Sequence, residues 1–118
     1  MDGIHLGDTR ATVITKLGTP KRSNSECWVY EKGPLNVCFS GDTVSYVRGA
    51  HLEQGSQTLL SDGDPIKALS EALPITPVSS SNVTFYFPTL DLLIIATPDG
   101  MRIRMMTLGK RIDALPMP

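Results

Sequence analysis

The chain has 118 residues and a mass of 12.8 kDa, which is the size of one compact domain. A formal net charge of −1 with 19% charged residues argues against a nucleic-acid binder, because such proteins normally carry a strong basic excess. No run of about 18 apolar residues occurs, so the sequence predicts no membrane span.

The opening residues Met1-Asp2-Gly3 lack the basic start and the apolar stretch of an export signal. We therefore expect either a cytoplasmic protein or a periplasmic or envelope protein from which a signal has been removed. The localisation stays open between these two.

An internal repeat predicts the domain organisation. Gly7-Asp8-Thr9 recurs as Gly63-Asp64-Pro65, and Leu17 recurs at the same spacing as Leu73. Repeats of this kind usually share one core. The sequence thus predicts an α+β fold: two tandem helix-plus-antiparallel-sheet repeats, residues 1–57 and 58–118, that form one compact domain.

In the first repeat, Asp8 is suited to cap a helix over residues 9–17, because its carboxylate can accept hydrogen bonds from amides of the first turn. Gly18 and Pro20 would end that helix. Alternation of apolar residues then predicts strands over residues 26–31, 35–40 and 43–49.

The polar residues 50–62 are predicted to form a connecting loop, followed by a helix over residues 65–73 with Pro65 at its first position. Pro74 and Pro77 would end this helix. The serine-rich residues 76–82 are predicted to form a second polar loop. Strands are expected over residues 83–87, 90–97 and 101–108.

A hairpin that pairs Tyr30 with Leu35 would place Cys27 opposite Cys38 on the adjacent strand. This arrangement allows a disulfide, whose formation depends on the position in the ladder. Two reduced thiols packed as small apolar residues are the alternative. The absence of an export signal favours the reduced pair, and both states stay open.

Catalytic and metal-binding patterns are weak. His5 and His51 lie in no ligand spacing, and the chain contains neither a Gly-x-Ser-x-Gly elbow nor a phosphate-binding loop. We therefore predict no enzyme activity, no metal and no cofactor. A small hydrolase that uses His5 or His51 is the third function class considered.

Exposed residues of the predicted sheet are the candidate protein contacts. Arg102 and Arg104 alternate with apolar neighbours, which predicts one basic and one apolar strand face, and Tyr46 is the third candidate. A solvated sheet face without a partner is the favoured explanation for the arginines. Trp28 is predicted to pack in the core.

The residues quoted above also carry a family resemblance. Ile4-x-Leu6-Gly7-Asp8-Thr9, Leu17-Gly18-x-Pro20 and Trp28-x-Tyr30, with Leu35-x-Val37-x-Phe39, resemble the SmpA/BamE-type domain of outer-membrane assembly lipoproteins. Two such units in tandem resemble the β-lactamase inhibitor protein family. The resemblance implies a non-enzymatic role in binding another protein.

The leading functional hypothesis is therefore a protein-interaction module, either an inhibitor or an assembly factor. Its expected contact surfaces are the sheet face away from the helices and residues 50–62 and 76–82. The alternative is a domain that senses a small molecule or envelope stress, with a ligand between helix and sheet. Homodimerisation through an unpaired strand edge is a further expectation.

Overall fold

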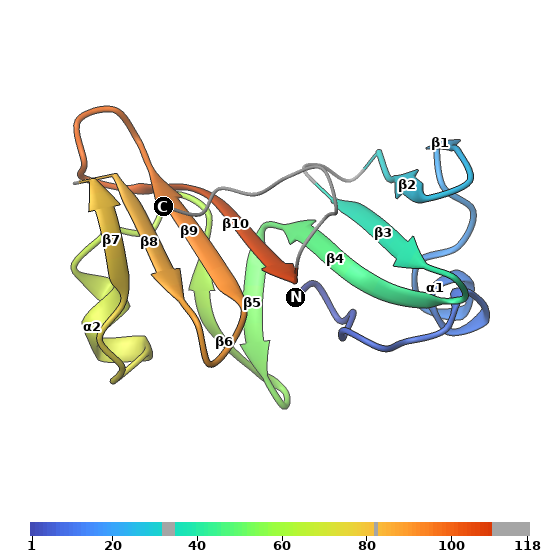
Figure 1. Ribbon diagram of the computed structural model, residues 1–118, viewed down its shortest axis with the longest axis horizontal. Helices are drawn as coiled ribbons and strands as arrows, with labels where there is room; N and C mark the ends of the chain where they lie inside the picture. Colours follow the sequence, from blue (N-terminus) through green and yellow to red (C-terminus); the bar gives the residue numbers. More distant parts are fainter. Residues whose placement is uncertain (32–34, 82, 110–118) are drawn as a thin grey trace.

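One antiparallel sheet of eight strands dominates the fold, which a computed structural model describes over residues 1–31, 35–81 and 83–109. The strand order is β1-β2-β3-β4-β10-β9-β8-β7, and β5 and β6 form a separate hairpin (Figure 1). In chain order the elements are α1 (Arg10–Leu17), β1 (Arg22–Ser23), β2 (Cys27–Val29), β3 (Asn36–Ser40), β4 (Thr43–Gly49), β5 (His51–Gln54), β6 (Gln57–Ser61), α2 (Ala68–Ala72), β7 (Val78–Ser81), β8 (Thr84–Phe87), β9 (Leu92–Ala96) and β10 (Ile103–Gly109).

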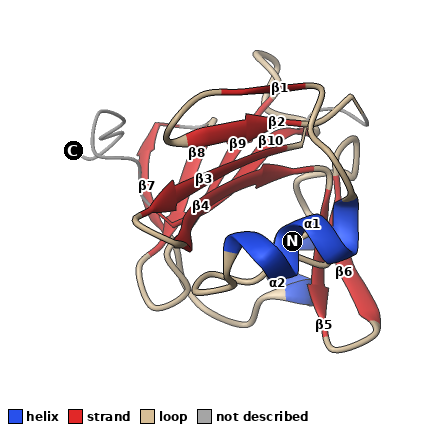
Figure 2. Cartoon of the chain, turned by 90° about the vertical axis from the view of Figure 1, so that its right-hand side faces the viewer, coloured by secondary structure: helices blue, strands red, loops and turns tan. Residues whose placement is uncertain are grey.

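The two ends of the sheet come from the two halves of the chain. Strands β4 and β10 meet in the middle as an antiparallel pair, with Met106 opposite Gly49 and Gly109 opposite Tyr46. Both helices and the β5–β6 hairpin lie on the same side of the sheet (Figure 2). The helices lie at opposite ends of the sheet, α1 near β3 and β4 and α2 near β7 and β8 (Figure 1).

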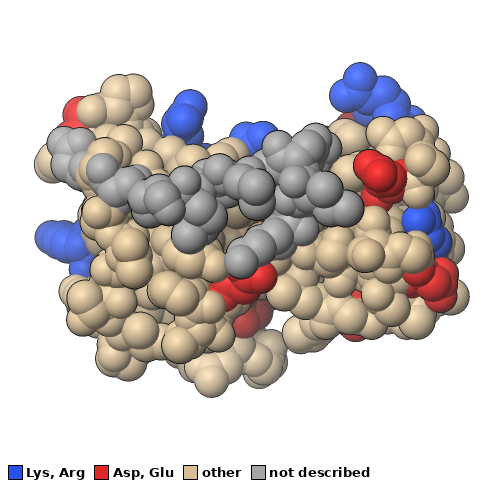
Figure 3. Space-filling model, viewed as in Figure 1, with Lys and Arg blue, Asp and Glu red and all other residues tan. Residues whose placement is uncertain are grey.

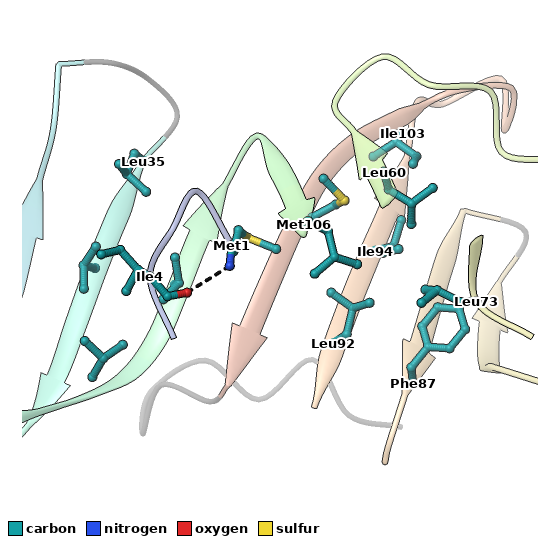
Figure 4. Packing of buried hydrophobic residues seen from close by; sticks show 14 of the residues in the cluster. Met1, Ile4, Leu35, Leu60, Leu73, Phe87, Leu92, Ile94, Ile103 and Met106 are labelled. Carbon is teal, nitrogen blue, oxygen red and sulfur yellow. Dashed lines mark hydrogen bonds between the residues drawn. The ribbon is translucent and has the colours of Figure 1, made fainter. Parts of the chain in front are cut away.

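The core fills the space between this sheet face and the covering elements. It includes Leu60 of β6 with Ile94 of β9 and Met106 of β10, and Leu73, which follows α2, with Phe87 of β8 (Figure 4). Burial of each large side chain stabilises the fold by about 1.5–3 kcal/mol. The largest fully buried side chains are Phe87, Ile4, Leu60, Leu92, Ile94, Ile103, Met106, Val13, Val37 and Val47.

The predicted α+β fold of two helix-plus-sheet repeats is wrong, because the protein is mostly β. The helices are short, eight residues in α1 and five in α2. The polar residues 50–62, expected as a loop, contain β5 and β6, and residues 76–82 contain β7. The division into residues 1–57 and 58–118 stays a prediction, and its boundary falls within β6.

Local backbone interactions explain why both helices are shorter than expected. Thr9 caps α1, with its side-chain oxygen accepting from the Thr12 amide at 3.2 Å, so Asp8 is not the cap. The Asp8 carboxylate instead accepts from the His5 amide at 2.9 Å. Pro65 forms an isolated bridge with Arg102, so α2 begins only at Ala68.

Candidate functional site

A sharp turn follows α2 and exposes apolar side chains. The Leu73 amide still donates to Leu69 O at 2.8 Å, and the Ile75 amide donates to Leu73 O at 2.7 Å around Pro74. Proline suits the centre of this three-residue turn because its ring fixes φ. Leu73 is buried at 6% exposure, whereas Ile75 is 40% exposed. We call Leu73–Ile75 the Pro74 turn.

An apolar hollow of about 390 Å³ lies between α2, the Pro74 turn and β8, and we call it the α2–β8 hollow. Its deepest side chains, Leu69, Leu73 and Phe87, are buried. Leu73 and Phe87 lie side by side (Figure 4). The described lining contains no charged residue and consists of Ile66, Leu69, Ser70, Leu73, Pro74, Ile75, Thr76, Pro77, Phe85 and Phe87.

A second hollow, of about 460 Å³, lies on the other side of the Pro74 turn. We call it the hairpin hollow, because β5 and β6 form one wall while β9 and β10 contribute to another. Its charged lining residue, Glu53, accepts a hydrogen bond from the Gly3 amide at 3.1 Å. Leu90, at its rim, is 39% exposed. The Pro74 turn and the linings of both hollows together form what we call the Pro74 surface.

A third hollow, of about 480 Å³, lies at the end of α1 and has a different chemical character. Tyr30 lines it and donates its hydroxyl proton to Gly18 O at 3.0 Å. Burial raises the pKa of Tyr30, so the phenol stays neutral and acts as a donor. Lys21 and Glu31, which also line it, approach each other to 3.9 Å. This hollow therefore has charged residues in its lining, which the described lining of the α2–β8 hollow lacks.

Asp62, just after β6, is a partly buried titratable group. Burial raises its pKa above the ordinary value of 3.8, and the nearby positive charge of Arg48 opposes that rise. Asp62 Oδ1 and Arg48 Nε are both buried without a hydrogen-bond partner. Two buried polar atoms without partners destabilise the folded state, because each has lost its hydrogen bonds to water.

Histidine, serine and aspartate also come together at this end of the hairpin. His51 Nδ1 lies 2.8 Å from Ser61 Oγ, and the charges of His51 and Asp62 interact. Neither His51, Ser61 nor Asp62 lines any of the three hollows described above. His5 is exposed, with its Nδ1 3.8 Å from Asp8 Oδ2. None of these three hollows is lined by His5 or His51, so they give no support to the hydrolase alternative.

Charged side chains lie in small separate groups over the face drawn in Figure 3. Within the residues that the structure describes, no group of three or more His, Cys, Asp or Glu side chains could hold a metal ion. The same part of the chain contains no helix with the length and apolar character needed to cross a membrane.

The predicted contact residues do not form one patch. Tyr46 lies opposite Gly109 at one end of β10, and Arg102 precedes the other end, which separates them by roughly 20 Å at the rise of an extended strand. The Arg102 guanidinium donates to Gly63 O at 2.8 Å, and Arg104 is exposed. Tyr46 is half-buried.

Several side chains on the sheet face that carries Tyr46 are buried. Cys38 lies directly opposite Tyr46, and Thr107 lies opposite both Arg48 and Leu93, so these side chains share one face. Cys38, Leu93 and Thr107 are all buried. A contact role for Tyr46, Arg102 and Arg104 stays a prediction.

Cys27 and Cys38 form a disulfide between β2 and β3, one of the two states that the sequence left open. The flanking pair Glu26 and Phe39 is joined by a backbone hydrogen bond of 2.7 Å, which makes Cys27 and Cys38 a non-hydrogen-bonded pair. Residues in such pairs lie closer together, and their Cα atoms are 4.0 Å apart. The bond therefore sits at the ladder position that brings two opposed side chains nearest.

Sequence reasoning missed the Pro74 surface. It interpreted Pro74 only as a helix stop, although Ile75 between two closely spaced prolines indicates a rigid turn with an exposed apolar side chain. The depth of the hollows could not be predicted in this way, because Leu73 meets Phe87 only in the folded chain.

No family model, no curated protein and no solved structure matches the chain. The resemblance to the SmpA/BamE-type domain and to the β-lactamase inhibitor protein family therefore stays a prediction.

Proposed function

We propose that the protein is a non-enzymatic protein-interaction module that binds an apolar segment of another protein across the Pro74 surface. One observation carries the proposal: two largely apolar hollows share the Pro74 turn as a wall, and Pro74 and Ile75 of this turn are exposed. Protein interfaces gain most of their binding free energy where a few apolar side chains enter such hollows.

The Pro74 turn suits this role because binding would order it little further. Proline already fixes the backbone at its centre, and Leu73 is anchored in the core. A preformed surface loses less conformational entropy on association than a loose loop does. The partner segment would place one apolar side chain in each hollow, on either side of Pro74.

The charges around the turn define the partner further. The α2–β8 hollow has no charged residue in its described lining, whereas Glu53 lines the hairpin hollow. The Glu53 carboxylate already lies 3.4 Å from the Met1 ammonium, so its charge is paired within the chain. The expected partner segment therefore carries two apolar anchors and needs no charged side chain beside them.

Affinity capture from an extract of the source cells, with the tagged wild type and two variants, tests the proposal. Ile75→Glu introduces a charge at the shared wall, and we expect it to lower the affinity for a stoichiometric partner at least tenfold, which is about 1.4 kcal/mol. Met101→Glu is the matched control, because Met101 is 65% exposed and lines neither hollow.

Loss of the partner with Ile75→Glu and its retention with Met101→Glu would support the proposal. Equal binding of the wild type and Ile75→Glu would contradict it. Sedimentation of the purified wild type tests the remaining occupant, a second copy of this chain. A dimer that Ile75→Glu dissociates would replace the foreign partner with self-association.

A further inference from the structure

The α2–β8 hollow has features that a protein contact does not require. It is lined on two sides by regular structure, its floor is buried, and its described lining is free of charge. We propose that this hollow also binds one small, uncharged molecule that is apolar over most of its surface and bears a single hydrogen-bond donor.

The volume of the hollow sets the size of this ligand. A dry cavity of about 150 Å³ in another protein accommodates benzene. The α2–β8 hollow measures about 390 Å³ and opens to the surface, so it accommodates a molecule of about two fused rings. This volume lies within the range of about 300–1,000 Å³ that small-molecule sites occupy.

The lining determines the charge of the ligand. Leu69, Leu73 and Phe87 would replace water around the bound molecule, and all three are apolar and buried. A carboxylate or ammonium group placed there would lose its hydration without gaining an opposite charge. The ligand that fits is therefore neutral.

Ser70 and Thr76 are the polar side chains of the described lining, and Ser70 lies on α2. Its side chain lines the hollow, and its hydroxyl donates to Lys67 O at 3.2 Å within α2. Because the hydroxyl proton is used in that bond, Oγ retains lone pairs that can accept from a ligand O–H or N–H. A ligand with one donor can form this hydrogen bond in place of water, whereas a ligand with only acceptors cannot.

The hollow at the end of α1 serves as an internal comparison. There Tyr30 donates to Gly18 O, and Lys21 and Glu31 line the rim. The described lining of the α2–β8 hollow contains no charged residue, and its hydroxyl groups belong to Ser70 and Thr76. A neutral apolar molecule should therefore bind at α2 and not at α1.

Titration of the purified protein with three probes of matched shape tests the proposal. We expect 2-naphthol to bind about fivefold more tightly than naphthalene, because of its hydrogen bond to Ser70, and 2-naphthoate to bind at least tenfold more weakly than 2-naphthol. In nuclear magnetic resonance spectra the amide shifts of Ile75, Phe85 and Phe87 and the methyl shifts of Ile75 should change. No partner protein is present, so failure here leaves the proposed interaction function standing.

Two variants of Ser70 and one control variant separate the effect of the hydrogen bond to Ser70 from the effect of the space in the hollow. Ser70 is exposed, so both of its variants should fold, and an unchanged amide spectrum away from α2 verifies this. Ser70→Ala should abolish the difference between 2-naphthol and naphthalene, and Ser70→Phe should weaken both by filling the hollow. Tyr30→Phe should leave all three affinities unchanged.

Three results would overturn the proposal: no shift changes with millimolar 2-naphthol, binding of 2-naphthoate as tight as that of 2-naphthol, or unaltered binding to Ser70→Phe. Shift changes confined to the hollow at α1 would also overturn it, because they would assign the ligand to the polar site.

Discussion

Gly109 is the residue whose replacement tests the contact between β4 and β10 most directly. Its φ of +82° lies in the left-handed region, where an L side chain is disfavoured by about 1–2 kcal/mol. A Cβ atom at this position would overlap the Ser45 backbone oxygen and lie 2.9 Å from both the Ser45 carbonyl carbon and Leu6 Cδ2. The β4 backbone would have to move to accommodate it.

Gly109→Ala should therefore lower the free energy of unfolding by about 2–5 kcal/mol. This sum combines the backbone cost with about 1–3 kcal/mol for an overpacked contact. Gly55 is the matched control, because its φ is also positive, at +63°, and a Cβ there would meet nothing within 4 Å. Gly55→Ala should cost only the backbone contribution, about 1–2 kcal/mol.

Urea denaturation followed by fluorescence of Trp28, the single tryptophan, measures both variants. Trp28 is a suitable reporter because its ring packs against Phe39 of β3, with centroids 4.6 Å apart. A Gly109→Ala variant as stable as Gly55→Ala, to within about 0.5 kcal/mol, would refute the reasoning. It would mean that the two strands do not approach as closely as the structure has them.

Two further predictions concern the disulfide and the buried carboxylate. Joint replacement of Cys27 and Cys38 by alanine should lower the free energy of unfolding by about 3 kcal/mol, because the bond closes a loop with a sequence separation of 11. A reductant should destabilise the wild type and leave the double variant unchanged. Equal effects of the reductant on both proteins would contradict this. Burial raises the pKa of Asp62, so its stabilising contribution is fully present below the unfolded pKa near 3.8 and is lost as the pH rises through the folded pKa. Asp62→Asn should thus match the wild type most closely below pH 3.8 and be the more stable protein at neutral pH. Urea denaturation at both pH values measures this, and the same difference in unfolding free energy between variant and wild type at both would contradict it.

The strands that alternate strongly were predictable from the sequence. Residues 43–49 form β4 as expected, and the pairing of Tyr30 with Leu35 places Cys27 opposite Cys38. Ile103 between two exposed arginines is buried, as the alternation of β10 predicted. In these segments the apolar period alone determines which side chains face the core.

The missed elements depend on neighbours that the sequence does not reveal. His51–Gln54 and Gln57–Ser61 are rich in polar residues, and they become strands because Gly55 adopts a positive φ and lets them pair with each other. The serines of β7 form a strand only because β8 offers an edge. Strand formation of this kind follows tertiary context more than propensity.

The site was only partly predictable for the same reason. Pro74 and Pro77 correctly predicted that the helix ends before residue 74. The hollow beside them depends on Phe85 and Phe87, which arrive from β8 after an intervening strand. A periodicity analysis can place each of these residues on a face, but it cannot determine that the faces leave a space between them.

The central position of β10 has a consequence for how the chain reaches its native state. Strands β4 and β9 both pair with β10, so each has an unpaired edge until β10 is in place. The pairing of β4 with β10 joins segments far apart in the chain, and such contacts form slowly because a long loop must close first. Before that step, each half of the sheet carries an open strand that can pair with a strand of another molecule. Dilute conditions and a rapid transit through this stage should therefore favour a monomeric product over aggregates during refolding.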